Sequence, residues 1–166
     1  MPSDRLDHPV LVLVSGLPGS GKTTHARVME QRLSAIRLSA DDWLGELALD
    51  LWEEDARDRI EQLQWQLAKR LVAVGASVVI EWGTWSRTER DHIRVEAQRL
   101  GARTELHHLA APGEVLYQRV VRRGREQPAI GGQQIAQWEA AFEIPTRDET
   151  ERWDHFGSID TSVDRR

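Results

Sequence analysis

The chain has 166 residues, a size that predicts one domain over residues 1–166 and a core that folds without disulfides or structural metal. Its 40% hydrophobic and 30% charged residues are typical of a soluble protein, and no apolar run approaches the roughly 20 residues that span a bilayer. With no cysteine and no signal-like start, we expect a cytoplasmic protein. The formal net charge of −5 argues against a general duplex-binding surface, which needs a broad basic face.

The first predicted elements are a buried strand, a glycine-rich loop and a helix. Residues 10–15 form a continuous apolar run, typical of a central parallel strand buried on both faces. A helix is expected over 22–33 and a short second strand over 35–38. Ser39 resembles the N-cap of a further helix, with Asp42 three residues on as the second member of a capping box.

The same alternation continues through the middle of the chain. Apolar spacing predicts a long amphipathic helix over 53–74, a buried strand over 77–81, a helix over 88–100 and a strand over 103–109. This order predicts an α/β fold, a parallel sheet covered by helices on both faces with right-handed crossovers. Ligands of such sheets bind at the carboxyl ends of the strands.

The last third of the chain is predicted to be helical and basic at first and polar at its end. After Pro112 a helical segment carries Arg119, Arg122, Arg123 and Arg125, and it breaks at Gly131 and Gly132. A second helical segment follows, and residues 156–160 are a candidate for a final strand.

The glycine-rich loop between the first strand and helix matches the pattern Gly-x-x-x-x-Gly-Lys-[Ser/Thr] completely, in the strand-loop-helix context that the motif requires. Glycines let backbone N–H groups and the helix N-terminus surround a phosphate. Lys22 would bridge the outer phosphates, and the Thr23 hydroxyl would be a ligand for Mg²⁺. The predicted nucleotide-binding residues of the loop are Gly16, Pro18, Gly19, Ser20, Gly21, Lys22, Thr23 and Thr24.

Two large classes of nucleotide-binding protein are disfavoured. A signalling GTPase would need an Asn-Lys-x-Asp segment, and the only lysine besides Lys22 is Lys69, in the sequence AKRL. A mechanochemical ATPase usually has an apolar strand that ends in Asp-Glu, whereas the strand at 77–81 ends in Glu81 alone. A kinase acting on a small molecule or a polynucleotide is the best-supported class.

Two aspartates follow the second strand, at the same edge of the sheet as the phosphate loop. A carboxylate there can accept the proton of an acceptor hydroxyl while the γ-phosphoryl group is transferred. The competing interpretation is helix capping, which fits Asp42 better than Asp41. Asp41 is therefore the predicted general base.

The four arginines on the basic segment are candidates for a lid at about 117–132. A basic helix and loop that closes over a triphosphate supplies positive charge and excludes water. A solvated helix face is the competing interpretation, and the arginine that reaches the phosphates is not identified by the pattern. The predicted phosphate contacts are Arg119, Arg122 and Arg123.

A tryptophan-rich loop follows the third predicted strand, at 77–81. Trp82 and Trp85 flank a Gly-Thr pair and are candidates for the wall of an acceptor pocket, although seven tryptophans in the chain make ordinary packing an equal competitor. Glu81 is a candidate to hold metal-bound water or a substrate hydroxyl. The predicted acceptor-binding residues are Asp41, Glu81, Trp82, Thr84, Trp85 and Arg87.

Two adjacent histidines, His107 and His108, lie on a predicted strand and therefore point to opposite faces of the sheet. They cannot share one metal ion, and we interpret them as structural. Trp65 and Trp138 lie on predicted helices and are interpreted as core or partner contacts.

The combination of four segments resembles the P-loop kinase family that includes the kinase domain of bacteriophage polynucleotide 5′-hydroxyl kinase and many bacterial AAA-type ATP-binding proteins. The segments are the phosphate loop, Ser-Ala-Asp-Asp-Trp, VVIEWGTWSRTERD and RVVRRGREQPAI, and the resemblance covers about residues 10–145. It implies a three-layer P-loop NTPase fold, a parallel sheet of about five strands with a small basic helical lid, and ATP with Mg²⁺ as cofactors. Lys22 and Thr23 match the family's phosphate and Mg²⁺ residues, Asp41 its general base and Arg123 its lid arginine.

One departure from the family pattern affects the expected acceptor. The phage enzyme has an arginine three residues after its base that binds the acceptor phosphate, and Leu44 stands there in this chain. With the acidic net charge, this favours a small hydroxyl-bearing acceptor such as a nucleoside, sugar or antibiotic. The alternatives are a polynucleotide 5′-hydroxyl kinase and, from another class, a nucleotide-dependent switch that binds a partner.

Overall fold

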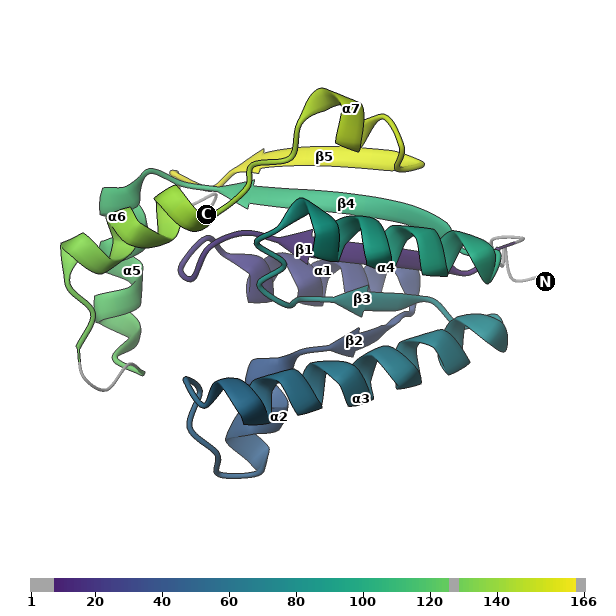
Figure 1. The fold of residues 1–166 in the computed structure, drawn as a ribbon, viewed down its shortest axis with the longest axis horizontal. Coiled ribbons are helices and arrows are strands. Elements are labelled where there is room, and N and C mark those ends of the chain that lie inside the picture. Colours follow the sequence, from purple (N-terminus) through teal and green to yellow (C-terminus); the bar gives the residue numbers. More distant parts are fainter. Residues whose placement is uncertain (1–7, 126–128, 164–166) are drawn as a thin grey trace.

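The computed structural model describes residues 8–125 and 129–163, and its centre is one five-stranded parallel sheet (Figure 1). The strand order is β2-β3-β1-β4-β5, and each neighbouring pair runs parallel. The strand that carries the phosphate loop is therefore central. The strands are β1 (Val10–Ser15), β2 (Ile36–Leu38), β3 (Val78–Ile80), β4 (Arg103–Ala110) and β5 (His155–Asp160).

Helices cover both faces of the sheet and its carboxyl edge. In Figure 1, α3 and α4 lie on the near face, α1 lies behind the sheet, and α5 and α6 stand beyond the carboxyl ends of the strands. None of the described helices is long and apolar enough to cross a bilayer. The helices are α1 (Lys22–Leu33), α2 (Ala40–Glu46), α3 (Glu54–Ala73), α4 (Arg87–Arg99), α5 (Gly113–Arg123), α6 (Gly132–Ala141) and α7 (Arg147–Thr150).

The hydrophobic core is divided by the sheet, and β1 contributes to both halves. Leu11 and Leu13 pack in the cluster beneath α3 and α4, whereas Val10, Val12 and Val14 pack against α1. All five side chains are buried. This alternation is the period of two expected for a strand with a helix layer on each face, and it holds the loop after Ser15 rigidly at the carboxyl edge.

The α/β fold with a parallel sheet and helices on both faces is confirmed. Every predicted strand is present, including the last one, which begins at His155. The predicted capping box at Ser39 is only half formed, because Ser39 Oγ accepts from the N–H of Asp42 while the Asp42 carboxylate binds Arg37 instead. A complete capping box forms at Ser86 and Glu89, so α4 begins one residue before the predicted start.

The helix α5, in the segment expected to be the lid, packs against the phosphate loop. Leu116 and Val120 of α5 pack with Leu17 of the loop, and α6 joins the same cluster through Ile135 and Trp138. Residues 126–128 of the expected lid lie outside the described residues. The described parts of α5 and α6 therefore stand over the carboxyl edge, where the predicted site residues also end.

Candidate functional site

A cavity of about 570 Å³ opens at the carboxyl edge of the sheet. Its walls combine the phosphate loop after β1, Asp41 after β2, the Glu81 to Trp85 loop after β3, the first half of α3, and the basic end of α5. Its volume is in the range of small-ligand sites. The lining residues are Pro18, Gly19, Gly21, Lys22, Thr23, Thr24, Arg27, Asp41, Leu51, Trp52, Glu54, Arg57, Asp58, Glu61, Glu81, Gly83, Thr84, Trp85, Glu89, Arg119, Arg123 and Arg125.

Lys22 is the first residue of α1 and lies against its own loop. Its ammonium group donates a hydrogen bond to the carbonyl oxygen of Leu17 at 3.0 Å. Burial lowers the pKa of Lys22 to about 8, and the carboxylates of Asp41 and Glu81 act in the opposite direction. The desolvation of this half-buried ammonium group outweighs the effect of the two carboxylates, and a bound phosphate would supply the further negative charge that favours the ammonium form.

Gly19 permits the close contact between the phosphate loop and α5. Its φ of +82° lies in the region that glycine tolerates best, and a Cβ built there would lie 2.9 Å from the carbonyl oxygen of Leu116. The phosphate loop and α5 are thus packed backbone to backbone. Position 19 has no room for a side chain.

Thr23 and Glu81 form an oxygen-rich corner next to Lys22. Thr23 Oγ1 lies 3.4 Å from Glu81 Oε1, and Arg37 Nη1 binds the same carboxylate oxygen at 2.8 Å. Glu81 Oε2 is buried and has no hydrogen-bond partner among the described residues. Burial raises the pKa of Glu81. Oxygen donors of this kind fit Mg²⁺, which binds proteins through few direct ligands and keeps several waters.

The two adjacent aspartates have different partners. Asp41 lines the cavity, and its Oδ1 lies 2.5 Å from Arg57 Nη2 of α3. Asp42 Oδ2 instead binds Arg37 Nη2 at 2.5 Å and does not line the cavity. The structure therefore separates two carboxylates that the sequence places side by side, and it brings only Asp41 to the cavity.

The first half of α3 adds an acidic wall that the sequence analysis missed. Glu54, Asp58 and Glu61 line the cavity with Arg57, whose Nη1 lies 3.7 Å from Glu61 Oε1. Burial raises the pKa of Glu61 to about 7, against the opposing effect of Arg57. The i, i+4 spacing of the helix is the signal that places these side chains on one face, but only the fold shows that this face borders the phosphate loop.

The tryptophan-rich loop after β3 is divided between cavity and core. Thr84 and Trp85 line the cavity, whereas Trp82 is buried and its Nε1 donates to Gln64 Oε1 at 2.7 Å. Thr84 has a φ of +45°, and its buried Oγ1 has no hydrogen-bond partner within the described ranges. A strained residue with an unsatisfied hydroxyl, facing a cavity, is a typical substrate contact.

Arg87 lies outside the cavity. Its guanidinium binds Asp148 Oδ2 at 2.7 Å and Asp91 Oδ2 at 3.3 Å, so its placement favours a structural role over that of an anion anchor. The neighbouring Arg90, which was not predicted, is fully buried. It binds Glu149 and donates to the carbonyl oxygen of Thr84, and in this way it supports the loop from behind.

Aromatic rings close one side of the cavity. Trp52, in the connection between α2 and α3, stacks on Trp138 of α6 with ring centroids 5.7 Å apart. Trp85 meets Trp138 edge to face at 6.3 Å. Trp138 is buried in the cluster that joins α5, α6 and the phosphate loop, as expected for a core residue, whereas Trp52 was not predicted as a site residue.

The predicted lid arginines are placed differently from one another. Arg119 donates to the carbonyl oxygen of Gly19 at 3.2 Å and to both the hydroxyl and the carbonyl oxygen of Thr161, after β5. Arg119, Arg123 and Arg125 line the cavity, whereas Arg122 is exposed and does not. Gly16 and Ser20 of the loop also lie outside the cavity lining.

Several solved structures share this fold. A provisionally assigned kinase from Chloroflexus aurantiacus has a TM-score of 0.72 at 19% identity, covering 95% of this chain and 88% of its own. A gluconokinase from Sinorhizobium meliloti has a TM-score of 0.63 at 18% identity, with 93% and 84% covered. A chain of the Pnkp1/Rnl/Hen1 RNA repair complex has a TM-score of 0.68 at 23% identity, with 83% and 45% covered.

These structural similarities show that the chain has the P-loop kinase fold. The similar structures include a gluconokinase and a chain of an RNA repair complex. No curated protein matches the sequence. The family model described as an AAA domain matches residues 11–145, which is most of the chain. The chain therefore belongs to this family of P-loop domains, whose phosphate loop implies nucleotide binding.

Proposed function

We propose that the protein is an ATP- and Mg²⁺-dependent kinase that transfers the γ-phosphate to a hydroxyl group of a small molecule. One observation carries this proposal: Asp41 lines the same cavity as Lys22 and Thr23 of the phosphate loop. A phosphate site and a carboxylate in one small cavity are what transfer to an alcohol requires, because the reaction depends on positioning and charge stabilisation.

The residues have separate roles in this proposal. The loop N–H groups and Lys22 hold the triphosphate, and the Thr23 hydroxyl with Glu81 holds the metal ion directly or through water. Mg²⁺ supplies positive charge that neutralises the phosphate oxygens during transfer. Asp41 accepts the proton of the acceptor hydroxyl, and Arg57 orients its carboxylate by the 2.5 Å contact. Arg119 and Arg123, which line the cavity, would hold the transferring group from the lid.

The distribution of charge in the cavity supports a small acceptor that lacks phosphate. Lys22, Arg119, Arg123 and Arg125 line the cavity at the phosphate loop and α5. The wall on α3 carries Glu54 and Asp58, together with Glu61, whose raised pKa of about 7 leaves it partly ionised at neutral pH, and Arg57, which is paired with Asp41. A 5′-hydroxyl oligonucleotide would place its own phosphates near that wall and be repelled. An uncharged or amine-bearing alcohol would not, and Trp52 and Trp85 offer it flat apolar surface.

The decisive experiment follows labelled γ-phosphate from Mg²⁺-ATP into a panel of acceptors. The panel contains sugars, nucleosides, aminocyclitols and a 5′-hydroxyl oligonucleotide, and it is run with the native chain, Asp41→Asn and Asp42→Asn. Loss of a general base lowers rates by about 10²- to 10⁴-fold. We expect that loss in Asp41→Asn with ATP affinity retained, and near-native transfer in Asp42→Asn, whose carboxylate lies outside the cavity.

Other outcomes would redirect the assignment. Label on the oligonucleotide, with turnover that falls steeply as salt rises, would favour the polynucleotide kinase. Label only in inorganic phosphate, together with a partner bound in the ATP state, would favour the switch. Equal loss of activity in both aspartate variants would remove the role proposed for Asp41.

A further inference from the structure

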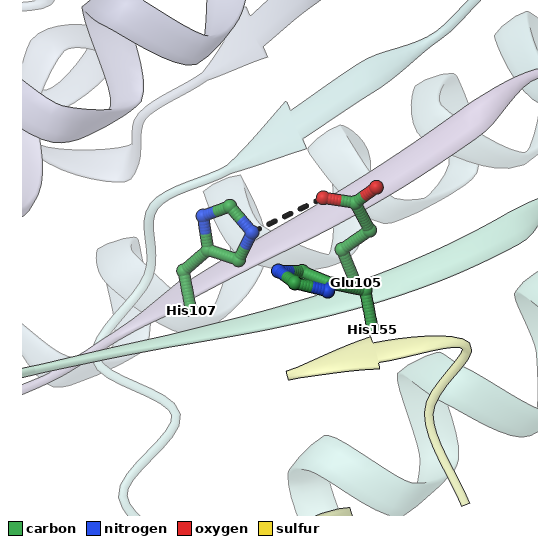
Figure 2. Close-up of side chains that lie close together, drawn as sticks. All are labelled: Glu105, His107 and His155. Atoms are coloured by element: carbon green, nitrogen blue, oxygen red, sulfur yellow. Dashed lines mark hydrogen bonds and ion pairs between the residues drawn. The ribbon is translucent and has the colours of Figure 1, made fainter. Parts of the chain in front are cut away.

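A cluster of histidine and glutamate side chains lies on the sheet away from the cavity. Glu105 and His107 of β4 and His155 of β5 each offer one ligand atom, and these atoms all lie within 4.8 Å of one another (Figure 2). His107 Nε2 is 3.1 Å from Glu105 Oε2. None of the three lines the cavity at the carboxyl edge.

The sheet itself brings the three residues together. Glu105 and His107 are two residues apart on β4 and therefore share a face, the face that α1 covers. His155 is the direct register partner of Glu105 in the parallel pair of β4 and β5. The rings of His107 and His155 meet edge to face with centroids 5.7 Å apart. The juxtaposition is thus set by the strand register and does not depend on a loop.

We propose that Glu105, His107 and His155 bind a divalent transition metal ion, with Zn²⁺ as the best match. Two imidazole nitrogens and one carboxylate oxygen are a common zinc ligand set, and a water would complete four-coordination. Ligand atoms about 2.1 Å from zinc in a tetrahedron are separated by about 3.4 Å. The Glu105–His107 separation already approximates that value, and His155 is exposed, so its ring is free to rotate inward.

His25 of α1 supplies the outer contact that metal-binding histidines use. His25 Nε2 and His107 Nδ1 are 2.7 Å apart, so one ring nitrogen of His107 is committed to His25 while Nε2 faces Glu105. A metal on His107 Nε2 requires a proton on Nδ1, which then donates to His25 Nε2. Such contacts fix the tautomer and the ring orientation of a ligand.

The two carboxylate oxygens of Glu105 also have different partners. Arg103 Nη2 lies 3.4 Å from Glu105 Oε1, whereas Oε2 is the oxygen that faces His107. Glu105 and His107 are buried, with side chains 12% and 7% exposed. Two of the three ligands are therefore held in place before a metal arrives, which lowers the entropy lost on binding.

A metal at this position would join the edge strand β5 to its neighbour β4. Strand β5 leads directly into Thr161, whose hydroxyl donates to the carbonyl oxygen of Ser20 in the phosphate loop at 2.8 Å. The bound metal would hold β5 against β4, and β5 in turn leads to the residue that contacts the phosphate loop. The proposed role of the metal is therefore structural. It does not rest on the proposed kinase activity.

The test measures Zn²⁺ binding to the untagged chain of residues 1–166 after treatment with a chelator. Isothermal titration is performed in excess Mg²⁺ so that the oxygen ligands of the phosphate loop are occupied. We expect one Zn²⁺ per chain, a higher Tm with Zn²⁺ than without it, and, with Co²⁺, a visible absorption band typical of four-coordination.

Three substitutions locate the site. His155→Gln and Glu105→Gln each remove a ligand and are expected to weaken Zn²⁺ binding by more than the roughly 10- to 100-fold that loss of an outer hydrogen-bond partner causes. His92→Gln, at an exposed histidine on α4, is the matched control and should bind as the native chain does. Absence of binding to the native chain, or equal binding by all three variants, would overturn the proposal. Because His155 is exposed, its variant is expected to fold normally.

Discussion

At the scale of single residues, the backbone of the phosphate loop is the most constrained part of the site. Gly19→Ala would place a methyl group 2.9 Å from the carbonyl oxygen of Leu116, in a left-handed conformation that costs alanine about 1 kcal/mol. We expect α5 to be displaced, the free energy of unfolding to fall by about 1–3 kcal/mol, and ATP affinity to decrease. Urea unfolding and a nucleotide titration measure the two effects.

The control for this substitution is Gly45→Ala in α2. A Cβ there meets no atom within 4 Å, and alanine is the better helix former by up to about 1 kcal/mol. That variant should be slightly more stable than the native chain. If Gly19→Ala behaved in the same way, the close packing of α5 on the phosphate loop would not matter for stability.

The low pKa of Lys22 predicts a pH dependence of nucleotide binding. A bound triphosphate favours the charged ammonium form of Lys22. In the protein without nucleotide, burial holds the pKa of Lys22 at about 8. Affinity should therefore be nearly constant below pH 8, and above it should fall by up to about tenfold per pH unit, because binding must then take up a proton. Isothermal titration in buffers of different ionisation enthalpy measures both affinity and proton uptake. The control is Lys69→Met, which should leave the profile unchanged.

At the scale of elements, α4 holds the tryptophan-rich loop through one buried ion pair. Arg90 Nε lies 2.6 Å from Glu149 Oε1, both side chains are essentially unexposed, and Arg90 also donates to the carbonyl oxygens of Thr84 and Glu143. Arg90→Met would leave Glu149 buried without its partner. We expect a loss of about 3–5 kcal/mol in the free energy of unfolding, measured with urea.

A double substitution separates the ion pair from the loss of packing. Arg90→Met with Glu149→Met removes both charges, and most of the stability should return because no buried charge is left unpaired. A double variant as unstable as Arg90→Met alone would mean that the hydrogen bonds to the loop carbonyls carry the effect instead.

At the scale of the whole molecule, the sequence predicts what lies close along the chain or at a strand end. Lys22, Asp41 and Glu81 each follow a predicted strand of the parallel sheet, and the rule that parallel strands end at one edge is enough to bring them together. Arg57, Trp52 and His155 could not be found in this way. Their roles depend on how α3 and the lid pack and on which strand borders β4, and these are properties of tertiary contacts that leave no local pattern.

Trp52 makes a long-range contact of this kind at the border of the cavity. Its exposed ring stacks on Trp138 with ring centroids 5.7 Å apart, so the connection before α3 contacts α6 beside the cavity. Trp52→Ala would remove this contact and admit water to the bound triphosphate. If the cavity is a kinase site, we expect ATP hydrolysis without acceptor to rise several-fold relative to phosphoryl transfer, with a higher KM for the acceptor.

The matched variant is Trp52→Phe, which keeps a flat ring able to stack on Trp138 and should retain most of the native ratio of transfer to hydrolysis. Because Trp52 lies on the surface, neither variant should change the free energy of unfolding by more than about 1 kcal/mol. A rise in hydrolysis in the alanine variant alone, at unchanged stability, would assign the effect to closure of the cavity. The same ratio in all three proteins would show that the stacked rings pack α6 against the connection before α3 without excluding water.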